Sequence, residues 1–356
     1  MEPEQKAQPV AKKSYQKPWF WAVTVVASVI AVIIVIALIA VVWYQQSLRP
    51  VDTSSKQTIR FEIKKGEGNG QIASNLEKAH VIKSAAAMVL YLRFAEKPAS
   101  LQAGTYVISP RYSVQKIVSH LETGKTDLYN ITILPGRTLS EIRSDLQKYG
   151  YSADEVNAAF EAKYDSPLLA DKPADASLEG YIYPETFEMS ASGDLKSLFS
   201  RSFDALYVKL QKDGMIDKFK ARNLNIHQAM TLASIIQKEA SDPADQPQIA
   251  QVFYTRLNGG MKLESDVTFH YGAKKLGVAP RVDLKSPYNT RLVAGLPPTP
   301  ISNMNYSALQ AVADPASGDY VYFIAGDDGK IYYGRTLEEH QANIKNHCQK
   351  LCGNAF

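Results

Sequence analysis

PWFWAVTVVASVIAVIIVIALIAVVWYQQ, residues 18–46, decides the architecture of the chain, because it contains no charged residue. As a helix, the stretch from Trp19 to Tyr44 would be about 39 Å long at ~1.5 Å per residue, which is enough to cross the ~30 Å hydrocarbon core of a membrane with some tilt. Aromatic residues cluster at both ends, as is typical of a membrane interface. The sequence therefore predicts a transmembrane helix over residues 19–44.

A cleaved signal peptide is the alternative for this segment. Its apolar core would be only ~7–15 residues long and would end at a small-residue cleavage site. AVVWYQQ, residues 40–46, offers no such site, so a retained single-pass anchor is favoured.

The flanks of this helix predict its orientation. The N-terminal tail, residues 1–18, is expected in the cytoplasm because lysines outnumber acidic residues there. These residues are Lys6, Lys12, Lys13 and Lys17 against Glu2 and Glu4. The rest of the chain is then predicted to lie outside the cytoplasmic membrane, in a periplasm or on the outer face of a single-membrane cell.

Composition limits the possible functions. The 356 residues are 45% hydrophobic and 21% charged, which allows two or three domains with real cores. The net charge of +4 is too small to indicate nucleic-acid binding. The six histidines and two cysteines match no metal-ligand spacing, and there is no Gly-rich phosphate loop. We expect no metal and no cofactor. For Cys348 and Cys352, a local disulfide and a pair of free thiols both stay open.

An internal repeat follows a polar linker at 45–57. FEIKKGEGNGQIASNL (61–76) and ITILPGRTLSEIRSDL (131–146) align without a gap, and each predicts a strand, a Gly turn and a short amphipathic helix. The matching pairs are Ile63 and Ile133, Gly66 and Gly136, Ile72 and Ile142, Ser74 and Ser144, and Leu76 and Leu146. The chain then becomes helix-rich, and DYVYFIAGDDGKIYYGR (319–335) predicts a β-hairpin before a final helix.

One acid in the helix-rich part stands out. In MTLASIIQKEASDP (230–243), helical periodicity places Glu239 on the same face as three apolar residues, while Gln237 and Lys238 are expected toward solvent. Burial of a carboxylate raises its pKa and costs free energy, so such a residue usually has a partner or a chemical role. Periodicity alone leaves open a structural salt bridge from Glu239 to a cation such as Arg256.

Five motifs carry a family resemblance. In order they are LEGYIYPETFEM (178–189), ASIIQKEA (233–240), VFYTRLNGGMKLESDVTFHYG (252–272), SPYNTRLVAGLPPTPISN (286–303) and YFIAGDDGKIYYGRTLEEH (322–340). Together they resemble the YceG-like family, the MltG-type endolytic murein transglycosylases. The resemblance implies an α+β fold with a single N-terminal transmembrane helix, a LysM-like β-α region at 58–192 that contains the repeat, and a mixed α/β catalytic domain at 193–356.

The resemblance also implies a chemistry. The family's catalytic glutamate lies in the ASIIQKEA segment, where some members carry two acids; here the earlier position is Gln237, which leaves Glu239. The implied enzyme is a lyase that cleaves MurNAc–GlcNAc bonds in nascent peptidoglycan strands, gives 1,6-anhydro-MurNAc ends and terminates strand elongation. Its implied partners are glycan strands, the cytoplasmic membrane and peptidoglycan synthases. Arg291 and Thr299 depart from the family pattern, which commonly has an aromatic residue and a glycine there.

The polar residues of two motifs are candidates for a sugar-binding cleft, because sugar sites use hydroxyls, amides and aromatic faces. These candidates are Ser265, Asp266, Thr268, Tyr288, Asn289 and Thr290. For Asp266 and Thr268 a helix cap or an Asx-turn is the alternative. Glu264 and Glu185 are alternative acids. Two other functions also stay open: a non-catalytic peptidoglycan-binding scaffold, and a hydrolytic muramidase in which Asp266 supplies the second carboxylate.

Overall fold

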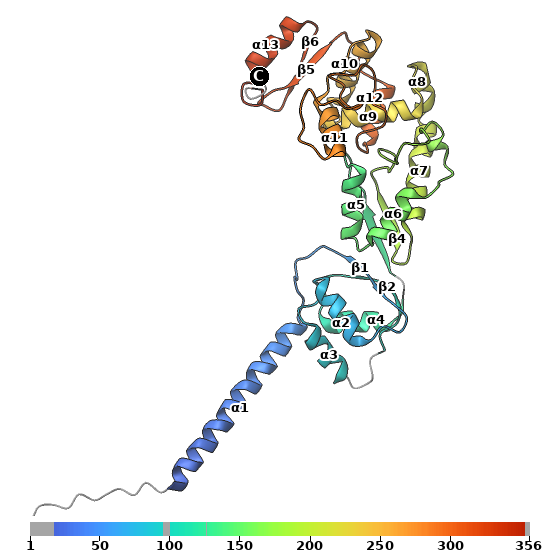
Figure 1. Ribbon diagram of the computed structural model, residues 1–356. Helices are drawn as coiled ribbons and strands as arrows, with labels where there is room; N and C mark the ends of the chain where they lie inside the picture. Colours follow the sequence, from blue (N-terminus) through green and yellow to red (C-terminus); the bar gives the residue numbers. More distant parts are fainter. Residues whose placement is uncertain (1–17, 95–99, 126, 353–356) are drawn as a thin grey trace, which may run out of the picture. The chain divides into compact units, whose positions relative to one another are not determined.

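The computed structural model describes residues 18–94, 100–125 and 127–352, and shows an α+β protein (Figure 1). The chain forms two compact units. The first contains the chain up to Thr58 together with Ile63–Gly104 and Ile108–Lys125, and the second contains Ile59–Glu62, Thr105–Val107 and the chain from Thr126 onward. The basic tail predicted to lie in the cytoplasm falls, up to residue 17, outside the described residues.

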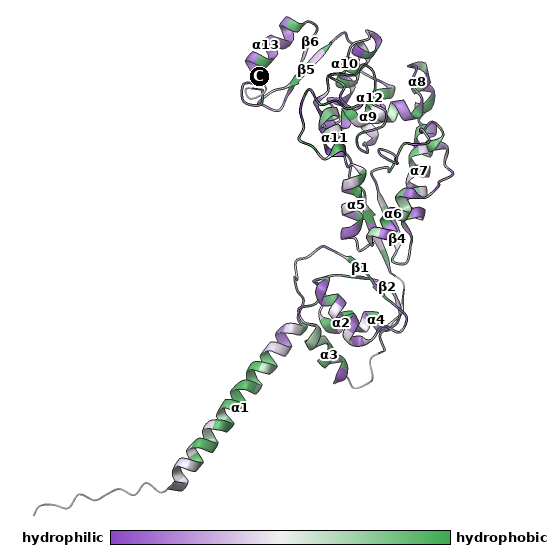
Figure 2. Ribbon diagram, in the orientation of Figure 1, coloured by the Kyte–Doolittle hydropathy of each residue, from purple (hydrophilic) through white to green (hydrophobic). Residues whose placement is uncertain are grey.

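Helix α1 (Pro18–Leu48) begins the first unit. Within the described residues, its segment Val23–Leu48 is the one helix long and apolar enough to cross a membrane, and none of its apolar window is buried by the protein. In the hydropathy view α1 is predominantly green along its length (Figure 2). The predicted apolar helix is therefore present and is available to a lipid environment.

The rest of the first unit consists mainly of helices around buried aliphatic residues, and its helices α2 and α3 pack together. Strands β1 and β2 pair with each other, and most of their residues belong to the second unit. The element bounds are β1 (Ile59–Ile63), α2 (Asn69–Lys78), α3 (Ala85–Arg93), β2 (Gly104–Ile108) and α4 (Val114–Glu122). Amphipathic periodicity explains the burial, since α4 buries Ile117 and Leu121 at i and i+4.

The second unit contains the remaining elements. They are β3 (Leu128–Thr132), α5 (Leu139–Lys148), α6 (Ala153–Glu161), the 3₁₀ turn η1 (Pro167–Leu169), β4 (Thr186–Ser190), α7 (Leu195–Lys212), α8 (Met215–Ala221), α9 (Ile226–Glu239), α10 (Gln246–Asn258), α11 (Asp266–Leu276), α12 (Tyr306–Ala313), β5 (Tyr322–Ala325), β6 (Ile331–Gly334) and α13 (Leu337–His347). Strand β3 pairs antiparallel with β4, and Ile131 lies opposite Phe187. Strand β5 pairs antiparallel with β6 as the predicted hairpin.

Both copies of the sequence repeat form a strand, a Gly turn and a helix. The turn glycines Gly66 and Gly136 have φ angles of +83° and +71°, a backbone region that side chains other than glycine rarely adopt. The aligned apolar pairs of the repeat are buried in both copies. The second helix, α5, also has a complete capping box between Thr138 and Glu141.

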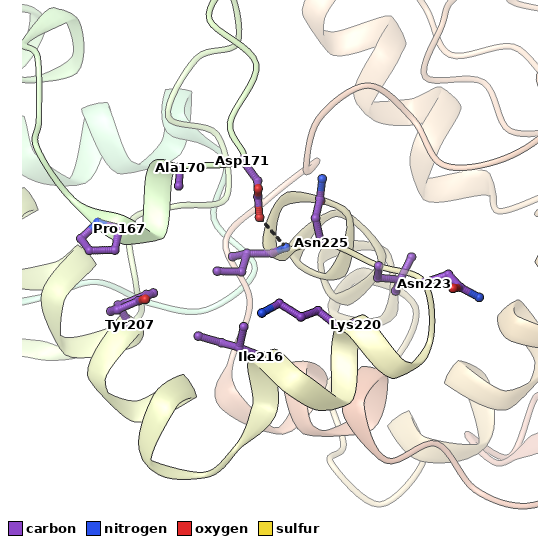
Figure 3. A pocket seen from close by; sticks show the side chains of 10 residues that line it. Pro167, Ala170, Asp171, Tyr207, Ile216, Lys220, Asn223 and Asn225 are labelled. Atoms are coloured by element: carbon purple, nitrogen blue, oxygen red, sulfur yellow. Dashed lines mark hydrogen bonds between the residues drawn. The ribbon is translucent and has the colours of Figure 1, made fainter.

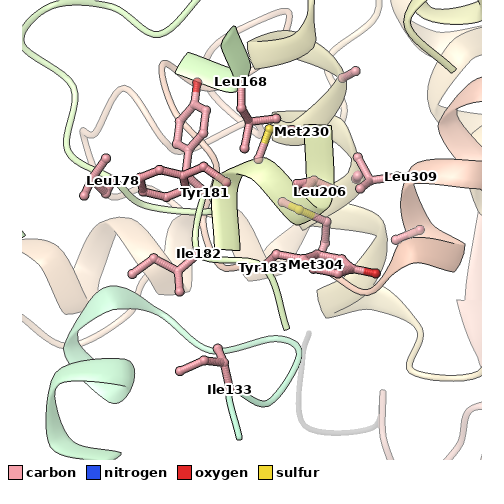
Figure 4. Packing of buried hydrophobic residues seen from close by; sticks show 14 of the residues in the cluster. Ile133, Leu168, Leu178, Tyr181, Ile182, Tyr183, Leu206, Met230, Met304 and Leu309 are labelled. Atoms are coloured by element: carbon pink, nitrogen blue, oxygen red, sulfur yellow. The ribbon is translucent and has the colours of Figure 1, made fainter. Parts of the chain in front are cut away.

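Helix α9 lies at the centre of the second unit. Its neighbours α8, α10, α11 and α12 pack against it, and the residues from Ala229 to Gln237 are all buried. Figure 4 shows part of this core, in which Met230 of α9 lies among side chains from distant parts of the chain, including Tyr181, Leu206 and Leu309.

The expectation that Gln237 faces solvent is wrong. Its side chain is only 6% exposed, and its Oε1 accepts a hydrogen bond from the backbone N of Asn305 at 2.9 Å. An amide can be buried in this way because the neighbouring chain offers a partner. Lys238 is exposed as expected.

The end of the chain is tied to the hairpin turn. Cys348 and Cys352 form a disulfide, which decides between the two alternatives that the sequence left open. The Asp327 carboxylate, in the turn between β5 and β6, accepts hydrogen bonds from the backbone N atoms of Gln349, Lys350 and Leu351. The disulfide loop therefore fastens the end of α13 to the hairpin.

Candidate active site

Glu239 is the last residue of α9 and is partly buried at the bottom of a cleft. On the same helix face, Leu232, Ile235 and Ile236 are fully buried. Burial raises the pKa of Glu239 to about 7, and the negative charge of Asp266 acts in the same direction. A hydrogen bond from Ser265 and the positive charge of Arg291 oppose this shift. A carboxyl with this pKa is substantially protonated at neutral pH and can both donate and accept a proton.

Ser265 holds the acid in place. It occupies the N-cap position of α11, yet its side chain accepts no hydrogen bond from the helix. Instead its Oγ donates to Glu239 Oε1 at 2.5 Å. A serine at an N-cap normally accepts a hydrogen bond from a backbone N–H of the first turn. The Ser265 hydroxyl instead donates its hydrogen bond to the Glu239 carboxyl group.

Thr268 and Thr290 fix the position of Ser265. The Ser265 backbone N donates to Thr290 Oγ1 at 3.1 Å, and Thr268 Oγ1 donates to the Ser265 carbonyl at 2.6 Å. The two threonine hydroxyls lie 2.9 Å apart. Both threonines are buried, so they support the site from behind and do not line the cleft.

Tyr288 and Asn289 stabilise the loop that supplies Thr290. Asn289 is fully buried, and its Nδ2 donates to the carbonyl oxygens of Val282 and Leu284, each at 2.9 Å. The Tyr288 hydroxyl lies 2.8 Å from Thr299 Oγ1. Direct contact between substrate and Tyr288, Asn289, Thr268 or Thr290 stays a prediction, while their contacts in the structure are those of supporting residues.

The cleft at Glu239 has a volume of about 480 Å³ and is open to one side. Its lining includes Glu239, Ser265, Asp266 and Arg291, together with a hairpin wall made of residues from β5, β6 and α13. The hairpin wall is aromatic and aliphatic, with the Tyr322 ring stacked on His340 at 5.0 Å between centroids. A polymer with hydroxyls and apolar ring faces suits such a lining. The sequence predicted the hairpin but gave no sign that it lines the same cleft as Glu239.

Arg256 does not pair with Glu239. Its Nη1 donates to Glu264 Oε2 at 3.0 Å and to the carbonyl of Lys262, while its Nε donates to the carbonyl of Val321. These bonds tie α10 to the segments on either side of the cleft. The structural salt bridge considered for Glu239 is therefore not formed, and Glu264, one of the alternative acids, is held by a guanidinium. Glu185, the other, is exposed and does not line the cleft.

Asp266 forms an ion pair at the mouth of the cleft. Its Oδ1 accepts a hydrogen bond from Arg291 Nε at 2.5 Å, and both side chains are partly exposed. Asp266 is the first residue of α11, where a negative charge is favoured by the helix dipole.

A second acid with a raised pKa was missed by the sequence reasoning. Glu179, in the LEGYIYPETFEM motif, is 5% exposed, and burial raises its pKa to about 7. Its Oε1 accepts from the backbone N of Leu139 at 2.9 Å, and its Oε2 accepts from the Tyr271 hydroxyl at 3.0 Å. Glu179 does not line the cleft. No periodic pattern surrounds it, so only its place in a motif could have singled it out.

Another cavity, of about 530 Å³, lies beside the N-terminus of α9 (Figure 3). Asp171 is the acid that lines it, and its Oδ2 accepts a hydrogen bond from the backbone N of Ile226. In the parts of the chain that the structure describes, no group of His, Cys, Asp or Glu could hold a metal ion. The cleft at Glu239 is thus the candidate active site.

A sequence model of the YceG-like family matches residues 61–346, which include every element of this cleft. The chain belongs to the YceG-like family. It is similar to the endolytic murein transglycosylase of Bacillus subtilis strain 168, with 31% identity over 315 residues that cover 82% of this chain and 86% of the relative. It is also similar to a crystal structure of a YceG-like protein from Listeria monocytogenes, with a TM-score of 0.56, 30% identity and coverage of 81% of this chain and 99% of that one.

A longer YceG-like relative is the endolytic murein transglycosylase of Streptococcus pneumoniae serotype 2 strain D39. It is 29% identical over 335 residues, which cover 85% of this chain but 60% of the relative. This chain therefore matches somewhat more than half the length of the streptococcal protein.

Proposed function

We propose that this YceG-like chain is a membrane-anchored lytic transglycosylase, a lyase that cuts MurNAc–GlcNAc bonds within nascent peptidoglycan strands and leaves 1,6-anhydro-MurNAc ends. The observation that carries the proposal is that the Glu239 carboxyl lines an open cleft and has a pKa raised to about 7. Relatives that carry the name endolytic murein transglycosylase support the choice of substrate.

The proposed reaction uses one group twice. Protonated Glu239 donates its proton to the glycosidic oxygen, and the bond from that oxygen to the muramyl C1 breaks. The resulting carboxylate then accepts the proton of the muramyl C6 hydroxyl as O6 bonds to C1. The proton balance closes without water, and the acid is ready for another turnover. A pKa near the working pH serves both steps.

Ser265 would assist between the two steps. Its Oγ donates to Glu239 Oε1, and a hydroxyl donor stabilises the ionised form of a carboxyl more than the neutral form. The hydrogen bond thereby limits how far burial can raise the pKa. It also fixes the direction in which the other carboxyl oxygen can face the substrate.

The proposal extends to the cellular arrangement. Residues 19–44 would anchor the enzyme in the cytoplasmic membrane with the N-terminus in the cytoplasm, residues 58–192 would form a LysM-like region that binds glycan, and residues 193–356 would form the catalytic domain. Glycan strands are the proposed partner, with peptidoglycan synthases nearby. An apolar helix whose apolar window is not buried by the protein supports the anchor, and a tether raises the local concentration of nascent strands.

The hydrolytic muramidase requires a second carboxylate to activate water or to attack C1. Asp266 is the neighbouring carboxylate in the lining of the cleft, but Arg291 occupies its Oδ1. The non-catalytic scaffold does not explain why a carboxyl with a raised pKa is retained in an open cleft. The transglycosylase accounts for both features.

Mass spectrometry of strand ends tests the proposal. Full-length protein in detergent would be incubated with uncrosslinked glycan strands of defined length. The proposed reaction gives internal cuts whose new ends are 1,6-anhydro-MurNAc. Reducing ends, which are heavier by one water, would establish the muramidase instead, and intact strands would establish the scaffold.

A further inference from the structure

Arg291 lies beside the catalytic carboxyl and is held firmly at one edge. Its backbone N donates to Asn289 Oδ1 at 3.1 Å, and its Nε donates to Asp266 Oδ1 at 2.5 Å. The preceding residue, Thr290, belongs to the hydrogen-bond network that fixes Ser265. The guanidinium is thus built on the same rigid loop that positions the acid.

The other edge of this guanidinium is free. Neither Nη1 nor Nη2 of Arg291 makes a hydrogen bond to any residue that the structure describes, the side chain is 38% exposed, and Arg291 lines the cleft. Arg256 also lines the cleft, but its side chain is only 7% exposed, and its Nε and Nη1 donate to protein acceptors. Of the two guanidinium groups, that of Arg291 is therefore the more accessible from the cleft.

The Nη1 and Nη2 edge of Arg291 is suited to bind a carboxylate. The two terminal nitrogens of a guanidinium form a planar fork that matches the two oxygens of a carboxylate. Asp266, bound to Nε, keeps the fork in one orientation, which lowers the entropy lost on binding. A carboxylate on a ligand in this cleft would therefore find a prepared partner.

The proposed substrate carries such carboxylates. The muramyl residue whose C1 reacts at Glu239 bears a lactyl group, which ends in a carboxyl or is extended by a short peptide with its own free carboxyls. Resting on the proposed function, we propose that Arg291, oriented by Asp266, binds a carboxylate on the lactyl or peptide substituent of the muramyl residue at the scissile bond. This contact would place the muramyl ring for the attack of O6 on C1 and would select substituted strands.

The test compares full-length wild type with Arg291→Gln in detergent. Arg281→Gln is the matched control, because Arg281 is an exposed arginine of the same connecting segment that pairs with Asp283 and does not line the cleft. Three substrates are used: peptide-bearing strands, the same strands with their carboxyls converted to amides by carbodiimide and ammonia, and strands stripped of peptide by an amidase, which exposes the lactyl carboxylate.

On peptide-bearing strands, Arg291→Gln should raise KM about tenfold with kcat within about twofold, as expected for the loss of one charge-assisted hydrogen bond to the substrate. Arg281→Gln should match wild type. On amidated strands the KM of wild type should rise about tenfold, and that of Arg291→Gln should not rise further. On peptide-bearing strands the lactyl carboxyl is in amide linkage, so a difference between wild type and variant on those strands identifies a carboxylate of the peptide. A difference on stripped strands identifies the lactyl carboxylate as a ligand.

Two results would overturn the inference: an unchanged KM in Arg291→Gln on peptide-bearing and stripped strands alike, or a loss of the same size on amidated and native strands, which would indicate a structural role. Failure of the proposed function is a separate outcome, seen as the absence of anhydro ends with every substrate. In that case Kd values of the same three strands for Glu239→Gln and for Glu239→Gln combined with Arg291→Gln still decide the question. A Kd that does not respond to Arg291→Gln or to amidation rejects the carboxylate contact.

Discussion

Glu239, which is partly buried, and Glu179, which is buried, are two acids of the second unit whose pKa values are both raised to about 7, yet their surroundings differ. Glu239 ends a central helix, contacts one hydroxyl and opens onto a cleft. Glu179 is 5% exposed, and each of its carboxyl oxygens accepts a hydrogen bond from the protein, one from the Leu139 backbone N and one from the Tyr271 hydroxyl. A raised pKa thus marks burial, while access and unused hydrogen-bonding capacity mark chemistry.

The difference also shows what each acid does for the fold. Leu139 is the first residue of α5, so Glu179 satisfies a backbone N–H that this helix cannot satisfy internally. Tyr271 lies in α11, whose N-cap is Ser265. Glu179 therefore links the second strand–turn–helix copy to the helix that begins after Ser265. Within the described residues, the Glu239 side chain bonds to Ser265.

The largest expected effect separates the two acids by activity. Glu239→Gln should lower the rate of anhydro-end formation by about a thousandfold or more, because the amide cannot donate and then accept the proton. Glu179→Gln should stay within about threefold of wild type. Rates on uncrosslinked strands, with circular dichroism to verify folding, provide the measurement. Equal losses in both variants, or a Glu239→Gln enzyme with substantial activity, would contradict the assignment.

For stability we expect the opposite order, with substitution of Glu179 costing more than substitution of Glu239. Glu179→Ala leaves the Leu139 N–H and the Tyr271 hydroxyl without partners, and each buried orphan costs ~1–3 kcal/mol, so we expect a loss of about 2–4 kcal/mol in the free energy of unfolding. Glu179→Gln should recover most of it, since its amide can accept from Leu139 and donate to the Tyr271 oxygen. Denaturant unfolding of both variants beside Glu239→Gln is the measurement. A Glu179→Ala protein as stable as wild type would show that these bonds carry no weight.

The comparison of the two acids also explains which features of the structure could be predicted from the sequence. The apolar helix, the strand–turn–helix form of both repeat copies, the hairpin and the apolar face that carries Glu239 follow from period and turn chemistry, which are local. The burial of Gln237 and Glu179 does not, because it depends on partners as distant as Asn305 and Tyr271. The same holds for the hairpin wall of the cleft, because the hairpin begins at Tyr322, 83 residues after Glu239 in the chain.

The candidate site divides in the same way. Ser265 was identified by its motif, but its hydrogen bond to Glu239 joins two helices and has no sequence signature. The neighbouring residues Thr268, Asn289 and Thr290 were identified as polar residues near a cleft, yet their side chains are buried among protein partners. A motif shows which residues gather at a site, and tertiary packing decides which of them face the substrate.

The smallest effect should come from Ser265→Ala, which tests the hydrogen bond between Ser265 and the Glu239 side chain. The Ser265 hydroxyl stabilises the ionised carboxyl and lowers its pKa against the effect of burial, so its removal should raise the pKa. Since Glu239 must be protonated for the first step, activity falls as pH rises through this pKa. The alkaline limb of the profile of kcat/KM against pH should therefore move to higher pH by about one unit, the equivalent of one hydrogen bond to a charged group.

The rate at the optimum should fall roughly threefold to tenfold in Ser265→Ala, because the carboxyl loses the contact that orients it. Thr268→Ser is the matched control, since it keeps the hydroxyl behind Ser265 and should leave the alkaline limb in place. A limb that moved to lower pH in Ser265→Ala would mean that the hydroxyl favours the protonated acid. An alkaline limb that did not move would mean that a group other than Glu239 controls it. The pKa of Glu239 would then not distinguish this acid from Glu179 in the reaction.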